Sequence, residues 1–242
     1  MSNALNVITP EWDCPDNVIA YSSTRAGGVS VGDFSGLNVG AHVGDDLLFV
    51  KTNRHQLPHN EKITWLEQVH GNKVVSLPSV DTTADAAVSS NRNFYCAIMT
   101  ADCVPILLCN KDGTQVGAVH AGWKGLENNI IANAIRAFKC EPNNIMAWIG
   151  PAISQRCYEV DTSVASRFST FDNVVKPSAN QGKFLLDLPA IAQQQLQNAN
   201  VFSVTQSALC TYSRQDLFYS HRFATHQNKR STGRIVSVIG LS

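Results

Sequence analysis

Three side chains in the first half of the chain are of the types that bind a transition metal: His70, Cys103 and His120. His120 follows the largely apolar run 115–119 and precedes the glycine-containing segment 121–125, where a ligand can approach the backbone closely. Three protein ligands drawn from His and Cys, with water as the fourth ligand, form the arrangement of catalytic zinc sites. We therefore expect these residues to converge on one metal ion at the active centre.

The spacing of these residues leaves other chemistry open. No C-x-x-C pair closes a zinc finger, and the zinc-deaminase signature, which combines H-x-E with P-C-x-x-C, is absent. A thiolate of Cys103 could act as a nucleophile with His120 as its base, oriented by Asp85 or Asp102. The same ligands suit copper, although seven histidines without an H-x-H pair are few for a multicopper oxidase. The remaining alternative is that these residues have no catalytic or metal-binding role and are a buried cysteine beside two hydrogen-bonded histidines.

Three arginines, Arg25, Arg222 and Arg234, are candidates for holding an anion, because the guanidinium fork matches phosphate or carboxylate. Each of them could equally be a surface cation. Arg25 precedes a segment with six glycines between positions 27 and 44, and a loop of this length is usually functional. Asn38 and Gln68 either bind a polar ligand or satisfy loop carbonyls.

The composition excludes several classes of protein. With 44% hydrophobic and 16% charged residues among 242, the chain resembles ordinary soluble globular proteins. Lys and Arg together number 19, as do Asp and Glu, so neither nucleic acid nor an anionic membrane is expected as a partner. The first ten residues lack the features of a signal peptide, which predicts a cytoplasmic protein. Seven scattered cysteines argue against a disulfide framework.

Hydrophobic periodicity predicts an α+β fold in a single domain over residues 1–242, of which 1–16 form an N-terminal extension. A β-hairpin is expected between 65–69 and 73–77, with His70 in its turn. Further strands are expected at 17–22, 86–88, 94–99, 146–149, 201–205 and 235–239, and helices at 45–57, 127–139 and 188–198.

Several segments, spread in order from about residue 18 to the C-terminus, resemble the YfiH family: T-R-A-G-G-V-S, L-N-V-G-A-H-V-G-D-D, W-L-E-Q-V-H-G, T-A-D-C-V-P-I-L-L, H-A-G-W-K-G and T-G-R. Members of this family are called purine nucleoside phosphorylases, and older names are polyphenol oxidase (laccase) and peptidoglycan editing factor. The resemblance implies a mixed β-sandwich flanked by helices and related to the deamidase domain of a bacterial cytotoxin. It also implies a zinc ion held by His70, Cys103 and His120.

The activity implied by the resemblance is phosphorolysis of adenosine, inosine and S-methyl-thioadenosine, together with deamination of adenosine. Its substrates would be a purine nucleoside and phosphate. Zinc is the expected cofactor, with copper as the alternative. We expect Cys103, Asp85 and His120 to be catalytic. Substrate contacts are expected from Arg25, Asn38, His42, Gln68, Gly122, Lys124 and Arg222, with phosphate held by Arg25 and the helix start at 122–125.

Three other functions remain as alternatives. The editing name suggests a zinc- or thiol-dependent amidase acting on peptidoglycan precursors, and the others are a copper polyphenol oxidase and a non-enzymatic zinc-binding module. One departure from the family pattern bears on the substrate site. The family usually reads S-Y-R-R near the C-terminus, and here His221 replaces the tyrosine and Phe223 the second arginine, while Arg222 keeps the first. The sequence predicts no particular oligomeric state.

Overall fold

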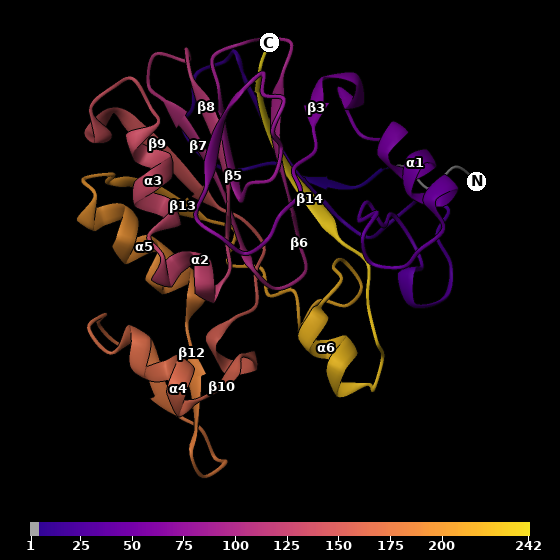
Figure 1. Cartoon of the computed structure of the whole chain (residues 1–242), viewed down its shortest axis with the longest axis vertical. Coiled ribbons are helices and arrows are strands. Elements are labelled where there is room, and N and C mark those ends of the chain that lie inside the picture. Colours follow the sequence, from indigo (N-terminus) through magenta and orange to yellow (C-terminus); the bar gives the residue numbers. More distant parts are fainter. Residues whose placement is uncertain (1–4) are drawn as a thin grey trace.

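Two β-sheets that pack face to face form the centre of the molecule (Figure 1). The structure is a computed structural model that describes residues 5–242, so positions 1–4 of the expected extension lie outside the described residues. The first sheet has the order β1 (Val7–Ile8), β2 (Val18–Ser23), β14 (Ile235–Leu241), β6 (Tyr95–Thr100) and β3 (Ile63–Thr64). The second has the order β13 (Ser203–Gln206), β9 (Ile145–Ile149), β7 (Val104–Asn110), β8 (Val116–Ala121), β5 (Ala86–Ser89) and β4 (Val74–Leu77).

Both large sheets are mixed. In the first, β2, β14 and β6 are antiparallel neighbours, and β3 runs parallel to β6. In the second, β9, β7, β8 and β5 are antiparallel neighbours, while β13 and β4 join its two edges in parallel. A third, antiparallel sheet consists of β10 (Glu159–Asp161), β12 (Lys183–Leu186) and β11 (Val175–Pro177) and lies at the lower end of Figure 1.

An apolar core fills the space between the two large sheets. Ile98 and Ile239 from the first sheet meet Leu107 and Trp148 from the second, and none of the four is more than 2% exposed. Burial of a large apolar side chain of this kind stabilises the fold by about 1.5–3 kcal/mol. The uninterrupted apolar runs in the sequence therefore correspond to strands that are buried on both faces.

Helices cover the outer face of the second sheet. Ile131 and Ala134 on one helix, and Ile191 and Leu196 on another, belong to one buried cluster with the strands beneath them. The helices of the described chain are α1 (Leu47–His55), α2 (Trp123–Glu127), α3 (Ile130–Arg136), α4 (Thr162–Ala165), α5 (Leu188–Asn198) and α6 (His221–His226). Figure 1 shows α2, α3 and α5 on one side of the sheets and α1 and α6 on the other.

Two of the predicted helices are confirmed, and an aspartate caps the start of each. The helix expected at 188–198 is α5, and the carboxylate of Asp187 caps it by accepting from the N–H of Ala190 at 3.0 Å. The helix expected at 45–57 is the shorter α1, where Asp46 accepts from the N–H of Leu48 at 2.7 Å.

The helix predicted over 127–139 is wrong in its extent, because the chain forms two short helices there. Asn129 adopts the left-handed conformation, with φ of 61°, between α2 and α3. Asn tolerates this conformation better than most residues and so ends a helix. The apolar positions Leu126, Ile130 and Ile131 nevertheless all point into the core, which explains why periodicity suggested one helix.

The hairpin predicted around His70 is also wrong. Strand β4 pairs in parallel with β5, and 65–69 contributes only an isolated bridge between Glu67 and Thr83. The backbone N–H groups that a hairpin would have used instead donate to a carboxylate, as described below. His70 adopts the left-handed conformation, with a φ of 59°, and the strand that follows its turn pairs with β5.

The glycine-rich segment 27–44 packs against the first sheet. Leu37 and Val39 are 0% exposed and join the cluster of Tyr21 and Tyr95. The amide of Asn53 in α1 donates to the carbonyl of Asn38 at 2.8 Å. The loop is therefore packed into the fold and held there by α1.

The elements together form a single α+β domain with mixed sheets. The 5–16 part of the predicted extension contributes β1, which pairs with β2. None of the helices between residues 5 and 242 combines the length and the apolar character that crossing a membrane requires.

Candidate metal centre

The side chains of His70, Cys103 and His120 converge at one end of the second sheet. His70 lies in the turn before β4, Cys103 in the turn between β6 and β7, and His120 near the end of β8. The ligand atoms that the three offer lie within 4.8 Å of one another, and the two imidazole rings meet edge to face with centroids 4.7 Å apart. The predicted convergence is confirmed, and the group could hold one metal ion.

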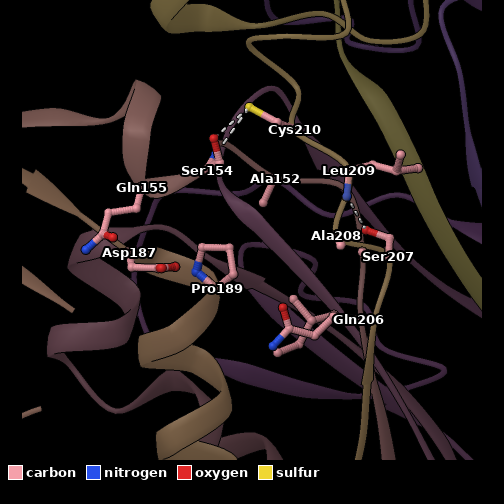
Figure 2. Close-up of a pocket in the computed structure, with 12 residues that line it drawn as sticks. Ala152, Ser154, Gln155, Asp187, Pro189, Gln206, Ser207, Ala208, Leu209 and Cys210 are labelled. Atoms are coloured by element: carbon pink, nitrogen blue, oxygen red, sulfur yellow. Dashed lines mark hydrogen bonds between the residues drawn. The ribbon is translucent and has the colours of Figure 1, made fainter. Parts of the chain in front are cut away.

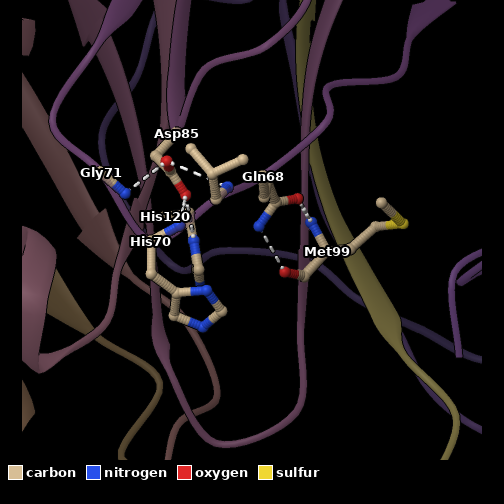
Figure 3. A network of polar contacts seen from close by, with 7 residues as sticks. Gln68, His70, Gly71, Asp85, Met99 and His120 are labelled. Atoms are coloured by element: carbon tan, nitrogen blue, oxygen red, sulfur yellow. Dashed lines mark hydrogen bonds and ion pairs between the residues drawn. The ribbon is translucent and has the colours of Figure 1, made fainter.

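Asp85 lies beside the two histidine ligands and contacts both of the segments that carry them (Figure 3). Its carboxylate is 0% exposed, and Oδ1 lies 2.8 Å from Nδ1 of His120. Because a carboxylate can only accept, Nδ1 of His120 carries a proton, and Nε2 is the ring nitrogen left to bind a metal once its own proton is lost. A carboxylate that holds the second nitrogen of a histidine ligand in this way is a common feature of zinc sites.

The same carboxylate shapes the turn that carries His70. The N–H of His70 donates to Oδ1 at 2.9 Å, while the N–H groups of Gly71 and Val69 donate to Oδ2 at 2.7 and 3.2 Å. Asp85 therefore fixes the backbone of one ligand and the imidazole of another. The carboxylate of Asp85 accepts from His120 and from the backbone of residues 69–71, and its expected catalytic role stays a prediction.

Gly122 approaches the centre closely, as expected of a residue beside the ligands. A Cβ atom at this position would lie 3.0 Å from Sγ of Cys103 and 3.3 Å from Cδ2 of His70. Its backbone conformation, with φ of −77°, is open to other residues, so the requirement for glycine comes from space rather than from the backbone. The three donors and this close approach fit a single metal ion.

The thiol of Cys103 is acidified by the two histidines. Burial alone would raise its pKa, but the charge and hydrogen bonds of His120 and His70 lower the pKa to about 6. Burial likewise would lower the pKa of His120, whereas Cys103 and Asp85 raise that pKa to about 9. Because the thiolate is the form of cysteine that binds a metal, the surroundings of Cys103 favour its role as a ligand.

A pocket of about 230 Å³ opens over the three ligands. Besides the ligands, its lining consists of His42, Gln68, Met99, Thr100, Ala101, His221 and Arg234. The chain thus brings together residues from the glycine-rich loop, from β6 and from the C-terminal segment around one metal-binding group.

The chain is similar to known proteins over nearly its full length. A protein of Shigella flexneri named purine nucleoside phosphorylase YfiH is 41% identical over 244 residues, which cover 97% of this chain and 98% of the relative. A Haemophilus influenzae protein named purine nucleoside phosphorylase is 35% identical over 97% of this chain and 99% of the relative. The model of a family described as multi-copper polyphenol oxidoreductase laccase matches residues 19–242. The chain belongs to the YfiH family.

Solved structures of YfiH-family proteins share the fold. A Neisseria meningitidis protein superimposes with a TM-score of 0.91 at 38% identity, covering 98% of this chain and 99% of that one. The YlmD protein of Geobacillus stearothermophilus superimposes with a TM-score of 0.86 at 29% identity, covering 99% of each chain.

Two of the predicted substrate residues of this YfiH-family chain line the pocket. His42 reaches it from the glycine-rich loop, and Gln68 from the segment before His70. The amide of Gln68 is held at both ends by Met99, since Nε2 donates to the carbonyl at 2.8 Å and Oε1 accepts from the N–H at 2.8 Å (Figure 3). Gln68 therefore ties the turn of His70 to the edge of β6 and forms part of the pocket wall.

Asn38 and Arg25 do not line the pocket. Asn38 is 0% exposed, and its Oδ1 accepts from the N–H groups of Gly40 and Arg234, both at 2.9 Å. Arg25 lies in a separate hollow, where its guanidinium stacks 4.6 Å from the centroid of Tyr219 and donates to backbone carbonyls. The structure thus brings Arg25 together with the glycine-rich loop and not with the metal ligands.

Arg222 and Lys124 also lie outside the pocket lining. The guanidinium of Arg222 donates to the carbonyl of Glu159 at 2.6 Å and stacks 4.8 Å from the centroid of Tyr158. Lys124 is exposed on the five-residue helix α2. The structure therefore does not bring Arg222 or Lys124 together with the metal ligands in the pocket lining.

Asp102, the expected alternative to Asp85 for orienting a histidine base, makes its hydrogen bonds to other residues. Its Oδ1 accepts from Thr211 at 2.7 Å and its Oδ2 from the N–H of Arg222 at 2.6 Å. Asp102 therefore anchors the start of α6 beside Cys103. The contact places the neighbouring His221 in the pocket lining. The sequence singled out His221 only as the residue that replaces the usual tyrosine of the family.

A second cavity of about 160 Å³ lies at another edge of the second sheet (Figure 2). Cys210 in its wall accepts from the hydroxyl and the N–H of Ser154, at 3.1 and 3.4 Å. Asp187, which also lines it, already caps α5. This cavity is separate from the pocket of the metal group.

Proposed function

We propose that this YfiH-family chain is a zinc-dependent purine nucleoside phosphorylase that acts on adenosine, inosine and S-methyl-thioadenosine and also deaminates adenosine. The observation that carries the proposal is the group of His70, Cys103 and His120 at the base of a pocket. It occurs in a chain that is 35–41% identical, over nearly its full length, to proteins named purine nucleoside phosphorylase.

Zinc is the metal that the donor set favours. Two imidazoles and a thiolate are typical ligands of zinc, and three protein ligands leave a coordination position for water or substrate. When bound, zinc supplies a Lewis-acid charge and lowers the pKa of a coordinated water. The group is the one cluster of at least three potential ligands found in residues 5–242, which is too few for the several copper ions that a multicopper name implies.

The chain's own residues prepare the centre for a polar substrate. Asp85 fixes the orientation of the His120 ring and keeps a proton on Nδ1, so that little rearrangement is needed when a metal binds at Nε2. We assign Asp85 the role of a positioning residue, and Cys103 and His120 the role of metal ligands at the reacting centre. Gln68 and His42 supply hydrogen-bonding groups in the wall above them.

The two remaining histidines of the pocket are suited to contact a nucleoside. Burial and the nearby charge of Arg234 lower the pKa of His42 and of His221. Both imidazoles are therefore neutral near pH 7, and each presents one donor and one acceptor to ribose hydroxyls or to the purine. From the family resemblance we also propose that the fold is related to the deamidase domain of a bacterial cytotoxin.

Phosphorolysis exchanges one bond at the ribose for another. An oxygen of phosphate forms a bond to the anomeric carbon while the bond from that carbon to the purine nitrogen breaks, and the purine leaves with the electron pair and takes up a proton. The test is to incubate the purified, zinc-loaded protein with inosine in phosphate buffer and in phosphate-free buffer and to identify the products. We expect hypoxanthine and ribose 1-phosphate, formed only with phosphate. Free ribose formed at the same rate without phosphate would contradict the proposal.

A further inference from the structure

Arg234 is a partly buried cation that faces the pocket without an acidic partner. Its Nη1 donates to the carbonyls of Thr232 and Gly233, at 2.8 and 3.1 Å. Within residues 5–242, neither its Nε nor its Nη2 has an acceptor, and it forms no ion pair with a carboxylate. A guanidinium offers five N–H donors in a planar fork, so three of them remain available in this residue of the pocket lining.

The surrounding structure holds this guanidinium in place. The N–H of Arg234 donates to Oδ1 of Asn38 at 2.9 Å, and the N–H of Val39 donates back to the carbonyl of Arg234 at 3.2 Å. The stem of the side chain passes so close to Gly40 that a Cβ atom there would lie 2.8 Å from its Cγ. The glycine-rich loop thus serves to fix Arg234, and the cost of ordering its long side chain is already met in the free protein.

No carboxylate among the described residues lines the pocket to neutralise this charge. The lining consists of imidazoles, one thiol, one amide, one hydroxyl, apolar groups and the guanidinium. Asp85 is engaged by His120 and by the backbone of its turn, and Asp102 by Thr211 and the N–H of Arg222. A bound divalent metal would add to the positive charge, since a single thiolate offsets only part of it. The pocket is therefore prepared for an anion.

The other candidate cations are held elsewhere. Arg25 stacks on Tyr219 in its own hollow, Arg222 donates to Glu159, and Lys124 is exposed on α2. Arg234 is the one Lys or Arg residue in the lining of the metal pocket within the described part of the chain.

We propose that Arg234 binds a phosphate group in the metal pocket through its free Nε and Nη2 donors. This inference rests on the proposed function in naming inorganic phosphate as the source of that group. Planar, two-pronged donation to phosphate oxygens is the geometry in which arginine exceeds lysine. Phosphate held there lies in the same pocket as the metal ligands, on the wall formed by the C-terminal segment, and is placed to attack the ribose of a nucleoside.

The experiment compares Arg234→Met with Arg92→Met, a matched change at an exposed arginine outside the pocket. Methionine keeps an unbranched stem against Gly40 and leaves the backbone contacts with Asn38 intact. We expect Arg234→Met to raise the KM for phosphate in inosine cleavage by about 10- to 100-fold, the effect of losing a charged hydrogen bond. Adenosine deamination, which uses water, should change by less than about threefold. Arg92→Met should leave both reactions at the wild-type level.

Arg234→Lys serves as a second variant in case Arg234→Met does not fold. It keeps the charge but not the fork, so its KM for phosphate should lie between those of the wild type and of Arg234→Met. An unchanged KM for phosphate in both variants would overturn the inference. Equal losses of phosphorolysis and deamination would also overturn it, because Arg234 would then position the nucleoside.

A binding measurement separates failure of this inference from failure of the proposed function. Inorganic phosphate is titrated by calorimetry into the zinc-loaded wild type and into Arg234→Met. If the wild type shows no phosphorolysis yet binds phosphate through Arg234, the proposed function fails and the phosphate site stands. If only inosine monophosphate, and not inorganic phosphate, loses affinity in the variant, the assignment to the co-substrate is overturned.

Discussion

The carboxylate of Asp85 lies 2.8 Å from Nδ1 of His120, and both side chains are almost completely buried, at 0% and 3% exposed. The same carboxylate accepts three backbone N–H groups from the turn that carries His70. One buried residue thus fixes two of the three metal ligands. The fold itself therefore orients the two histidine ligands, and it does not need a bound ion to do so.

Replacing this carboxylate should weaken metal binding. An amide in Asp85→Asn keeps one acceptor oxygen but presents N–H donors where the carboxylate accepted. Removal of such a partner typically reduces metal affinity by about 10- to 100-fold, and we expect a loss in that range. Competition with a zinc chelator measures it, with Asp81→Asn, at an exposed carboxylate, as the control. Wild-type zinc affinity in Asp85→Asn would show that Asp85 does not position His120.

Cys103 should be required as a ligand. If it binds the metal, Cys103→Ala should lose both bound zinc and turnover, because two histidines alone hold zinc weakly. If it is a nucleophile instead, the variant should keep a full complement of zinc while losing all turnover. Cys210→Ala is the matched control, since Cys210 also accepts hydrogen bonds but lines the separate cavity. Metal analysis of the two purified variants decides between a ligand and a nucleophile.

Gly122 should tolerate no side chain while the centre is loaded. A Cβ atom 3.0 Å from Sγ of Cys103 is closer than ordinary contact, so in Gly122→Ala the ligand has to move. We expect zinc affinity to fall while the unfolding temperature of the metal-free protein changes little, because the φ of Gly122 suits alanine. A large loss of stability in the metal-free variant, with unchanged zinc affinity, would contradict this account of the position.

Asn38 should contribute to stability rather than to substrate affinity. Truncation in Asn38→Ala leaves the buried N–H groups of Gly40 and Arg234 without an acceptor. An unsatisfied buried group costs about 1–3 kcal/mol, so the free energy of unfolding should fall by at least about 2 kcal/mol. Urea denaturation measures this, with Asn72→Ala, at an exposed asparagine, as the control. A loss of nucleoside affinity at unchanged stability would instead support the original expectation for Asn38.

The metal ligands were predictable from the sequence because their types are distinctive. Cys103 lies just before β7 and His120 near the end of β8, and the antiparallel register that pairs Pro105 with His120 brings the two side chains together. His70 was likewise selected by its residue type, and the family resemblance implied the same three ligands, whereas the spacing gave little support. Its turn depends on Asp85, a residue 15 positions away that accepts its backbone N–H groups, and local sequence patterns do not show such contacts.

The cation of the pocket was harder to predict, for a related reason. Arg25, Arg222 and Arg234 have the same chemistry, and the sequence offered no reason to choose Arg234 over the others. Their placement depends on distant partners: Tyr219 receives the guanidinium of Arg25, and Asn38 holds the backbone of Arg234 across 196 positions. Contacts of this kind are set by tertiary packing, and the structure is needed to find them.

The central claim is that phosphate-dependent cleavage of purine nucleosides takes place at the group of His70, Cys103 and His120. The most direct measurement is the rate of inosine phosphorolysis in chelator-treated protein as zinc is added back in known ratios to the chain. The account predicts no turnover without metal and a linear rise that ends at one zinc per chain, with no such rise in Cys103→Ala. Full turnover by the metal-free wild type, or the same rise in Cys103→Ala, would contradict it.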